Sequence, residues 1–432
     1  MDRQQRRIPP GPAQGYQPTA DLLEWMGRQF DLFGDIYKTS IYGTDAYVVR
    51  NVESAYHVLV ENWQNYVKGQ IIERVGLLLG NGLMVSEGAT WKRQRRMIQP
   101  TFNPGSVATV IQMVKAVNLR LLEKWQLAAS SNESVNITKD VSSMALEIIL
   151  RFIFGEEYEH VAGDFDLLAQ EKARDMAFAR SFRGLRKVIL QLIEMRRRRI
   201  ATPTDALAAL MLARDPRTGQ SMEDRQLVDE ILTLVVAGHE TTASTLNFAW
   251  YLLTQHSPVE ERLSDELSQI ACSELDDQSN SIYAMQIIDE TMRLYPAGWL
   301  LTRKALRDDW LGDYFVPAGT EIYVSPYFIQ RNPSLWEEPD RFDPDRFRPD
   351  VVKQRHRLAT IPFSTGPRNC IGVHFAKMEM QVHLIMIARR LRFSYVPVRP
   401  IELEAGVNLR SSCDFIMKPS GKVDDHRFAA SG

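Results

Sequence analysis

The sequence predicts a mainly α protein with a smaller β part, and three observations support this α+β class. Apolar residues recur with helical spacing through most of residues 91–199. The longest helical pattern covers residues 222–256. The period-two alternation that is typical of strands is confined to residues 36–49, 305–326 and 409–417.

The composition is that of a soluble globular protein large enough to bury a cofactor, with 44% hydrophobic and 25% charged residues in 432. A formal net charge of -2 argues against a nucleic-acid binder. Cys272, Cys370 and Cys413 are a sparse, odd set that fits a reducing compartment. No apolar run reaches the length of a membrane span and residues 1–12 lack a signal-peptide core, so we expect a cytoplasmic protein with no integral membrane segment.

The N-terminal elements follow from local pattern. Residues 1–20 form an extended lead-in rich in Pro and Gly, and residues 21–30 are expected to be the first helix. The alternating residues 36–42 and 46–49 predict a β-hairpin, and a helix follows from Val52. We find no repeat, linker or low-complexity tract, so we expect residues 1–432 to be a single domain.

The long helical pattern carries an unusual centre, Ala237-Gly238-His239-Glu240-Thr241. Gly destabilises a helix interior by about 1 kcal/mol relative to Ala, so a glycine at position 238 needs an explanation. We expect that a flat ligand packs against it. The Thr241 hydroxyl can bond back to the Ala237 carbonyl and distort the helix. We interpret His239 as a packing residue, and Glu240 with Thr241 as either a polar stripe or a functional pair.

Further along, Glu290 and Arg293 stand at i and i+3 on one face of a predicted helix. Such a pair alone is common and usually superficial. Two Pro-Asp-Arg-Phe segments follow, which offer Arg341 and Arg346 as partners from the loop ahead of the next motif.

Cys370 ends a tight loop that contains Phe363, Gly366 and Arg368, and an apolar helical run begins at Val373. A helix N-terminus facing the sulfur is expected to lower the thiol pKa, which suits a nucleophile or a metal ligand. The nearby His374 points elsewhere on the helix, and no second Cys stands at zinc spacing. A single thiolate, shielded by an aromatic ring and beside a cation, matches the needs of a haem-thiolate site.

This segment resembles the haem-binding loop of the cytochrome P450 family, F-x-x-G-x-R-x-C-x-G, with all five fixed positions present as Phe363, Gly366, Arg368, Cys370 and Gly372. The resemblance implies the P450 fold, with haem b held between the long central helix and the helix after Cys370. Cys370 is then the iron ligand, and Phe363, Gly366, Arg368 and Gly372 are expected to belong to the cofactor-binding residues with it.

Other motifs extend the resemblance. Trp91 and Arg95 are similar to the family's W-x-x-x-R pair, which reaches one haem propionate, and Arg303 corresponds to a contact with the second. The neighbouring Lys92, Arg93 and Arg96 form a basic patch that is either a solvated face or a docking site for an acidic electron donor.

The central helix is also similar to the family's. The resemblance implies that Ala237 and Gly238 border the haem and a groove for dioxygen, and that Glu240 and Thr241 form an acid–alcohol pair that relays protons through water.

Glu290 and Arg293 resemble the E-x-x-R pair, whose third member by family placement is Arg346. We expect this network to hold the Cys loop structurally.

Three regions leave alternatives open. Residues 69–88 mix apolar side chains with glycines and are either core packing or the loop over the substrate pocket. Compared with the family, the chain contracts near residues 179–182 and 273–281, through a reduced lid or through loops missing from the chain. The Pro-rich residues 6–12 resemble the hinge after a membrane anchor, so an anchor removed from the chain is a further alternative.

The resemblance implies a monooxygenase that inserts one oxygen atom of O2 into a lipophilic small molecule such as a fatty acid, terpenoid or carotenoid. No flavin or iron–sulfur segment is fused, so we expect a separate ferredoxin or flavodoxin-type electron donor with its reductase. The alternatives are a P450-fold peroxygenase, isomerase or dehydratase, and a non-catalytic haem-binding protein. A cysteine hydrolase is a third reading, and it lacks an evident base.

Overall fold

The computed structural model describes residues 7–17, 21–41, 43–170, 176–198, 205–270 and 281–422, with backbone alone at residues 167, 170 and 176–181. The predicted contraction at residues 273–281 therefore lies outside the described residues, except for Ser281. Of the other predicted contraction, only Phe182 has a described side chain.

Helices dominate the fold, as the sequence predicts. The first, α1, begins where the Asp21 side chain accepts from the Glu24 N–H at 2.7 Å, a standard N-terminal cap. The helices in chain order are α1 (Leu22–Phe33), α2 (Val52–Tyr56), α3 (Gln70–Leu79), α4 (Gly88–Ile98), α5 (Pro104–Ala108), α6 (Ile111–Ser130), α7 (Ile137–Phe154), α8 (Tyr158–Phe165), α9 (Leu167–Gln170), α10 (Met176–Arg197), α11 (Ala206–Leu212), α12 (Asp224–Gln255), α13 (Ser257–Gln269), α14 (Ile282–Leu294), α15 (Pro326–Ile329), α16 (Pro349–Val352) and α17 (Val373–Ala388).

The strands build one five-stranded sheet and three small ones. They are β1 (Ile36–Ile41), β2 (Thr44–Val49), β3 (Tyr66–Lys68), β4 (Val135–Asn136), β5 (Leu301–Ala305), β6 (Asp309–Leu311), β7 (Tyr314–Val316), β8 (Glu321–Val324), β9 (Leu391–Tyr395), β10 (Leu403–Ala405), β11 (Leu409–Ser411) and β12 (Ile416–Gly421). The large sheet has the order β1-β2-β8-β5-β3. The predicted hairpin is β1–β2, and β8 joins it in parallel through Ala46↔Glu321 to Val49↔Val324.

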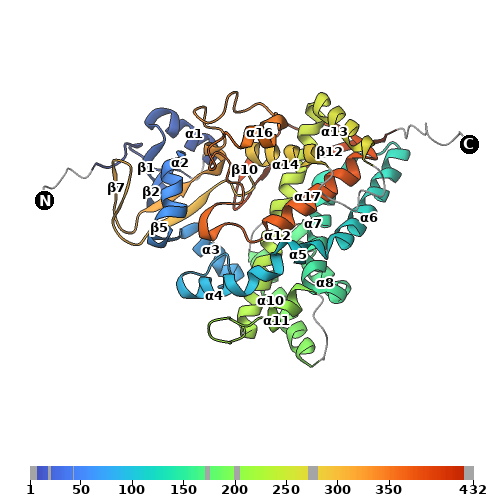
Figure 1. Ribbon diagram of the computed structural model, residues 1–432, viewed down its shortest axis with the longest axis horizontal. Coiled ribbons are helices and arrows are strands. Elements are labelled where there is room, and N and C mark those ends of the chain that lie inside the picture. Colours follow the sequence, from blue (N-terminus) through green and yellow to red (C-terminus); the bar gives the residue numbers. More distant parts are fainter. Residues whose placement is uncertain are drawn as a thin grey trace, which may run out of the picture.

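The β-rich part and the helical part lie at opposite sides of the molecule (Figure 1). The helix α12 crosses the middle of the helical part, where its residues share one large apolar core with α7, α14 and α17. A second core lies under the large sheet and includes Val49, Ile322 and Val324, each fully buried. The fold class that the sequence predicts is therefore confirmed.

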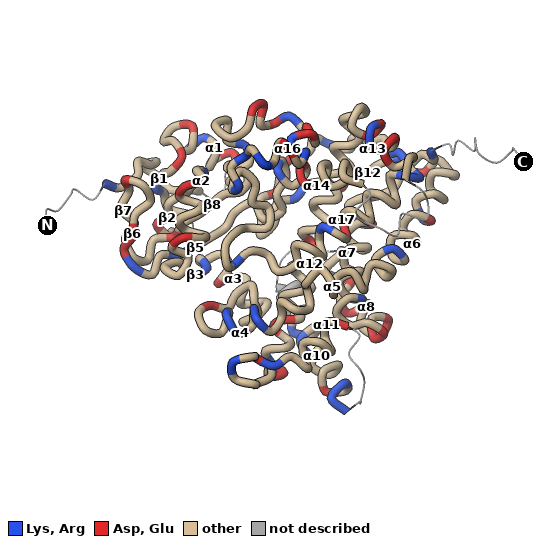
Figure 2. Tube along the Cα trace, viewed as in Figure 1, with Lys and Arg blue, Asp and Glu red and all other residues tan. Residues whose placement is uncertain are grey.

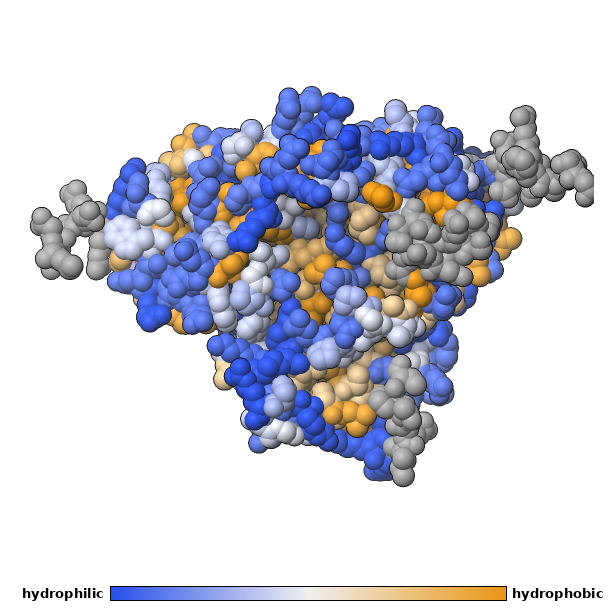
Figure 3. All heavy atoms as spheres, viewed as in Figure 1, coloured by the Kyte–Doolittle hydropathy of each residue, from blue (hydrophilic) through white to orange (hydrophobic). Residues whose placement is uncertain are grey.

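Two surface views bear on the expected partners. Basic and acidic residues are interspersed along the described trace as seen in Figure 2. In Figure 3, apolar side chains gather in a hollow in the middle of the visible face, between the β-rich part and the helices. Among the described residues, none of the helices has the length and apolar character needed to cross a membrane.

Candidate active site

Cys370 lies at the end of a loop that closes on itself. Its backbone N–H donates to the Phe363 carbonyl at 2.9 Å, and Gly372 then forms the N-terminal cap of α17. Gly366 has φ 73°, and a Cβ there would lie 2.2 Å from the Leu59 carbonyl oxygen, so only Gly fits. This loop therefore fixes the sulfur directly before a long helix.

The pKa of the Cys370 thiol differs from the one expected for a cysteine at a helix N-terminus. Cys370 reaches accessible space on one side, while the protein packed around its other sides raises the pKa of the thiol. The Gly372 N–H and the Arg95 charge act in the opposite direction and do not outweigh that desolvation. The predicted lowering of the Cys370 pKa was wrong for these protein surroundings, and a metal ion bound to the sulfur would stabilise the thiolate.

Arg368 is anchored beneath the loop by groups far away in the sequence. It donates to the Tyr66 carbonyl at 2.6 Å and forms an ion pair with Glu87. Glu87 also accepts from the backbone N–H of Lys68 at 2.7 Å. The Lys68 ammonium is buried, donates to two backbone carbonyls at 2.8 Å, and has its pKa lowered to about 7 by burial.

The sequence analysis missed Lys68 and Glu87. Neither residue stands in a motif that it used, and Glu87 pairs with Arg368 of the Cys loop, which lies far away in the sequence. The pairing of β3 with β5 places Lys68 opposite Arg303.

Trp91 and Arg95 lie on the face of α4 that contacts the Cys loop. Arg95 donates to the Asn369 carbonyl at 2.7 Å and to its side-chain oxygen at 2.9 Å. Trp91 is buried edge-to-face against Trp63, with the Arg368 guanidinium 5.5 Å from its ring centre. The structure therefore brings the two predicted residues to Cys370 from another part of the chain.

The neighbouring basic residues are occupied within the protein. Arg96 pairs with Asp215 at 3.1 Å, and Arg93 donates to the Ser221 carbonyl at 2.7 Å. Lys92 is exposed, with its ammonium 5.5 Å from the centre of the Trp63 ring. For Arg93 and Arg96, the structure thus favours a structural role over a free basic patch.

Arg303 is a buried cation on β5. Among the described residues, the one hydrogen bond that its guanidinium makes is to the Thr302 carbonyl at 2.8 Å. Burial lowers its pKa to about 10. An anionic group placed beside Arg303 would satisfy a charge that these protein contacts leave poorly compensated.

The centre of α12 has the predicted back-bond, and its glycine also packs against a neighbouring helix. The Thr241 hydroxyl donates to the Ala237 carbonyl at 2.8 Å, within a helix that stays continuous from Asp224 to Gln255. A Cβ on Gly238 would lie 2.9 Å from the Ile149 side chain of α7. Gly238 therefore allows α7 to approach α12 closely, and its expected contact with a flat ligand stays a prediction.

Glu240 is held by residues that the sequence did not indicate. Its carboxylate accepts from Asn408 at 2.9 Å and lies 3.5 Å from Arg410, both near β11. His239 is buried, contacts the Ser142 hydroxyl at 2.9 Å, and has its pKa lowered to about 4 by burial. This geometry agrees with the interpretation of His239 as a packing residue.

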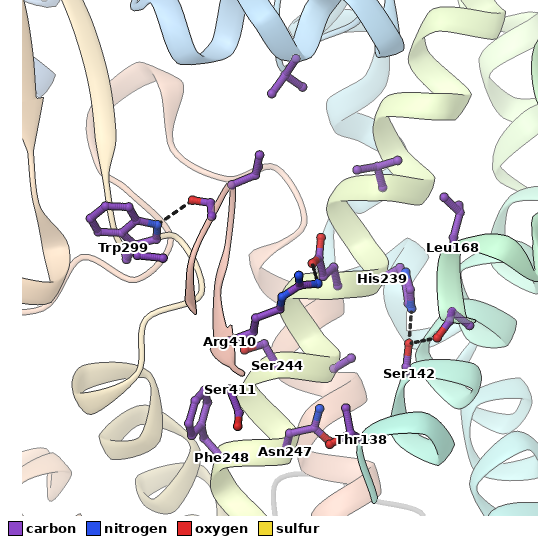
Figure 4. A pocket seen from close by; sticks show the side chains of 18 of the residues that line it. Thr138, Ser142, Leu168, His239, Ser244, Asn247, Phe248, Trp299, Arg410 and Ser411 are labelled. Atoms are coloured by element: carbon purple, nitrogen blue, oxygen red, sulfur yellow. Dashed lines mark hydrogen bonds and ion pairs between the residues drawn. The ribbon is translucent and has the colours of Figure 1, made fainter. Parts of the chain in front are cut away.

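A cavity of about 490 Å³ runs along α12 between α3, α7 and the β10–β11 turn. Figure 4 shows Trp299, Arg410 and His239 around its middle, with Asn247 and Phe248 toward the opposite end from α3. Its walls include Ile71, Val75, Leu78 and Leu79. The 69–88 region therefore borders the pocket and also contributes to the apolar core. The cavity can take an elongated, mostly apolar molecule.

The Glu290–Arg293 pair is fully buried and bidentate, with N···O distances of 2.6 and 2.8 Å. Arg346 Nε lies 3.6 Å from Glu290, whereas the Arg341 side chain is exposed and pairs with Glu338. The Arg341 carbonyl nevertheless accepts from Arg293 at 3.0 Å. The network thus ties α14 to the loop that precedes the Cys segment.

These residues fit a flat cofactor that carries carboxylates. One thiol reaches accessible space, and the buried Arg303 has no carboxylate partner of its own among the described residues. A thiol ligand and buried cations together match an iron porphyrin with two propionates.

Comparison with known proteins agrees with this geometry. The family model described as Cytochrome P450 matches residues 11–178 and 165–411. The chain is 31% identical over 84% of its length to cyclooctat-9-en-7-ol 5-monooxygenase of Streptomyces melanosporofaciens, covering 83% of that protein. It is 27% identical over 89% of its length to the chloroplastic protein LUTEIN DEFICIENT 5 of Arabidopsis thaliana, covering 71% of that protein.

The fold has close counterparts among solved structures. A cyanobacterial cytochrome P450 with bound retinoic acid superposes with a TM-score of 0.87 at 23% identity, over 96% of this chain and 99% of that one. The Cys370 loop, the buried Glu290–Arg293 pair, the superposition and the family match all lead to one conclusion. The chain belongs to the cytochrome P450 family of haem monooxygenases.

Proposed function

We propose that the protein binds haem b through Cys370 and inserts one oxygen atom of O2 into a lipophilic small molecule. The observation that carries this proposal is the Cys370 loop, which presents a single thiol to accessible space at the start of α17. Bound haem supplies the activation of dioxygen, which no side chain can provide.

The residues around the loop have defined roles in this proposal. Arg95 lies beside Cys370 and, with Trp91, is placed to contact one propionate, while Arg303 is placed for the other. Arg368 positions the loop by joining it to Glu87 and to the strand that contains Tyr66. Ala237 lies on the helix that would cover the opposite face of the cofactor.

Glu240 and Thr241 are the proposed proton-handling residues. The Thr241 hydroxyl donates to Ala237 O, so its oxygen still accepts a hydrogen bond from a water or from substrate. Glu240 lines the cavity and lies 3.5 Å from Arg410, and its carboxylate oxygens can accept a hydrogen bond from a proton-carrying water.

The cavity and the relatives together support a terpenoid or carotenoid substrate. The walls are mainly aliphatic and aromatic, and the interior cation Arg410 is paired with Glu240 and Glu404, which does not favour a fatty-acid carboxylate there. Relatives are named cyclooctat-9-en-7-ol 5-monooxygenase, pentalenene oxygenase and carotene epsilon-monooxygenase. These names concern terpenoids or carotenoids.

The electrons are proposed to come from a separate ferredoxin or flavodoxin-type donor with its reductase. Lys92 is exposed on α4, beside the residues that contact the Cys loop, and is a candidate contact for an acidic donor. We also propose a cytoplasmic location, which rests on the sparse cysteines.

The test is the absorption spectrum of the purified protein, reduced and exposed to carbon monoxide. We expect the red-shifted Soret band of a thiolate–carbonyl complex, lost in Cys370→Ala. Cys413→Ala removes the other cysteine that the structure describes, which is buried and lies outside the site, and should keep the band. A thiolate-type band that persists in Cys370→Ala would overturn the assignment.

A further inference from the structure

Asn247 is a buried side chain with unused hydrogen-bonding capacity at one end of the cavity. It lies on α12, is 7% exposed, and lines the cavity that His239 and Glu240 also line. Its side-chain oxygen has no hydrogen-bond partner among the described residues. Figure 4 shows Asn247 toward the same end of the cavity as Thr138, Phe248 and Ser411.

The hydroxyl groups that line the cavity near Asn247 bond to other partners, and none of the described residues donates to the Asn247 oxygen. Ser244 donates to the Leu409 carbonyl at 2.7 Å, and the Thr138 hydroxyl accepts from the Phe415 N–H at 2.8 Å. Ser411 accepts from the Cys413 N–H at 3.2 Å. The Asn247 oxygen is therefore an acceptor that this end of the cavity leaves unsatisfied, and burying such an acceptor is costly unless a ligand pairs with it.

We propose, on the basis of the proposed function, that Asn247 binds a neutral hydroxyl group on a lipophilic substrate. A hydroxyl donates to the carboxamide oxygen and can also accept from the carboxamide nitrogen, so either orientation of the amide is served. A carboxylate has no donor, so it could bond only the carboxamide nitrogen and would leave the Asn247 oxygen unsatisfied. A hydrocarbon would leave the Asn247 oxygen unsatisfied.

The charges within the cavity agree with a neutral ligand. Arg410 pairs with Glu240 at 3.5 Å and with Glu404 at 2.8 Å, so the interior cation is compensated by two carboxylates. Of the other charged residues that line the cavity, Asp414 is acidic and Arg74 is exposed, so a carboxylate buried at Asn247 would add charge without an interior cation beside it. Lys139, the other cation at this end of the cavity, is exposed to solvent.

The position of Asn247 also sets a length. Thr241 and Ala237 lie six and ten residues before it on one continuous helix, which corresponds to about 9 and about 15 Å along the axis. The substrate hydroxyl that Asn247 binds would thus lie about 9–15 Å from the carbon that is oxidised near Thr241 and Ala237. The proposed substrate is an elongated, already hydroxylated isoprenoid.

Calorimetric binding to the haem-loaded protein tests the proposal with three probes that share one skeleton. These are all-trans-retinol, retinoic acid, and the hydrocarbon in which a methyl group replaces the CH2OH group. One neutral hydrogen bond should make wild type bind retinol about fivefold more tightly than the hydrocarbon. Asn247→Leu should reduce this ratio to about one, mainly by weakening retinol.

Ser244→Ala is the matched control, because Ser244 lines the same cavity one turn away but already donates its hydroxyl proton to Leu409. It should preserve the fivefold ratio. Asn247→Ala, which adds no bulk, replaces Asn247→Leu if the larger side chain impairs folding.

Equal affinities for retinol and the hydrocarbon in wild type would overturn the proposal, and so would a ratio unchanged in both Asn247 variants. Tighter binding of retinoic acid than of retinol would also overturn it and would indicate a charged anchor such as Lys139. Failure of the proposed function would instead appear as loss of the thiolate–carbonyl spectrum, whatever the three affinities are.

Discussion

The Thr241 hydroxyl is tied to the helix backbone at the position where the proposed chemistry needs a proton. It donates to Ala237 O at 2.8 Å, and its oxygen remains available as an acceptor. We expect Thr241→Ala to consume reducing equivalents with several-fold less product and with release of hydrogen peroxide, because a hydroxyl that orders proton-carrying water is lost. The measurement is the ratio of product to NAD(P)H oxidised.

Thr245 offers a matched control. Its hydroxyl makes the same kind of back-bond, to the Thr241 carbonyl at 3.0 Å, but Thr245 is buried one turn further along α12. Thr245→Ala should leave the ratio of product to reducing equivalents unchanged, and Thr241→Ser should restore most of it. Equal uncoupling in Thr241→Ala and Thr245→Ala would show that helix distortion, not proton handling, is responsible.

The same residues show what a sequence can and cannot predict at this scale. The bond from Thr241 to Ala237 spans four residues of one helix, so the local pattern is sufficient to predict it. The partners of Glu240 lie about 170 positions away, and the structure places them there by folding back the β10–β11 turn. The packing of Gly238 against Ile149 could not be predicted for a related reason, since Ile149 lies on another helix, α7, which local pattern does not reveal.

At the scale of elements, a buried ion pair within α14 holds Arg293, whose guanidinium joins α14 to the segment before Cys370. Arg293 bonds Glu290 and also donates to the carbonyls of Gln330, Pro339 and Arg341. Arg293→Ala should lower the free energy of unfolding by about 3–5 kcal/mol, because it leaves the Glu290 charge buried and unpaired. Chemical denaturation followed by circular dichroism measures this loss.

Arg341→Ala is a control of the same chemical type. Arg341 pairs with Glu338, also at i and i+3 and at 2.8 Å, but both side chains are exposed. Its replacement should leave the free energy of unfolding nearly unchanged. A comparable loss in both variants would mean that the buried network does not hold the loop.

The free energy that stabilises the packing of α17 on α6 and α12 should depend on pH. His383 is buried, accepts from Trp250 at 2.8 Å and lies 2.7 Å from the Asn118 side-chain oxygen, and burial lowers its pKa to about 3. Between pH 6.5 and 3 the unfolded chain takes up a proton that the folded His383 refuses. Its contribution should therefore fall by about 1.4 kcal/mol per pH unit as the pH decreases through this range.

His383→Gln tests this dependence, because Gln can accept from Trp250 and donate to Asn118 without titrating. The difference in unfolding free energy between wild type and His383→Gln should change with this slope below pH 6.5 and stay constant above it. A difference that does not vary with pH would exclude His383 as the titrating group.

Elements were predictable where their signal is local. The cap at Asp21, the long pattern of α12 and the start of α17 after Gly372 all follow from residues within one or two turns. The order of the large sheet could not be predicted, because β2 pairs with β8 across more than two hundred residues. Alternation identifies strands but does not identify their neighbours.

At the scale of the molecule, we propose that the chain is a single cooperative unit. The large sheet combines strands from the first seventy residues with strands from residues 301–324, so no single cut in the sequence separates it. Its strand β3 also contacts the Cys site, because Arg368 donates to the Tyr66 carbonyl. Loss of packing in the core under the large sheet should therefore also destabilise the helices.

Ile322→Ala tests this coupling. Ile322 is fully buried in the core under the sheet, and its truncation should cost about 2–5 kcal/mol. The helical circular dichroism signal, which arises mostly from the opposite part of the molecule, should then melt in one transition at a lower temperature. Leu306→Ala, at a side chain 53% exposed directly after β5, should leave the midpoint unchanged. An unshifted helical transition in Ile322→Ala would show that the β-rich part unfolds on its own, and the single-domain assignment would then be wrong.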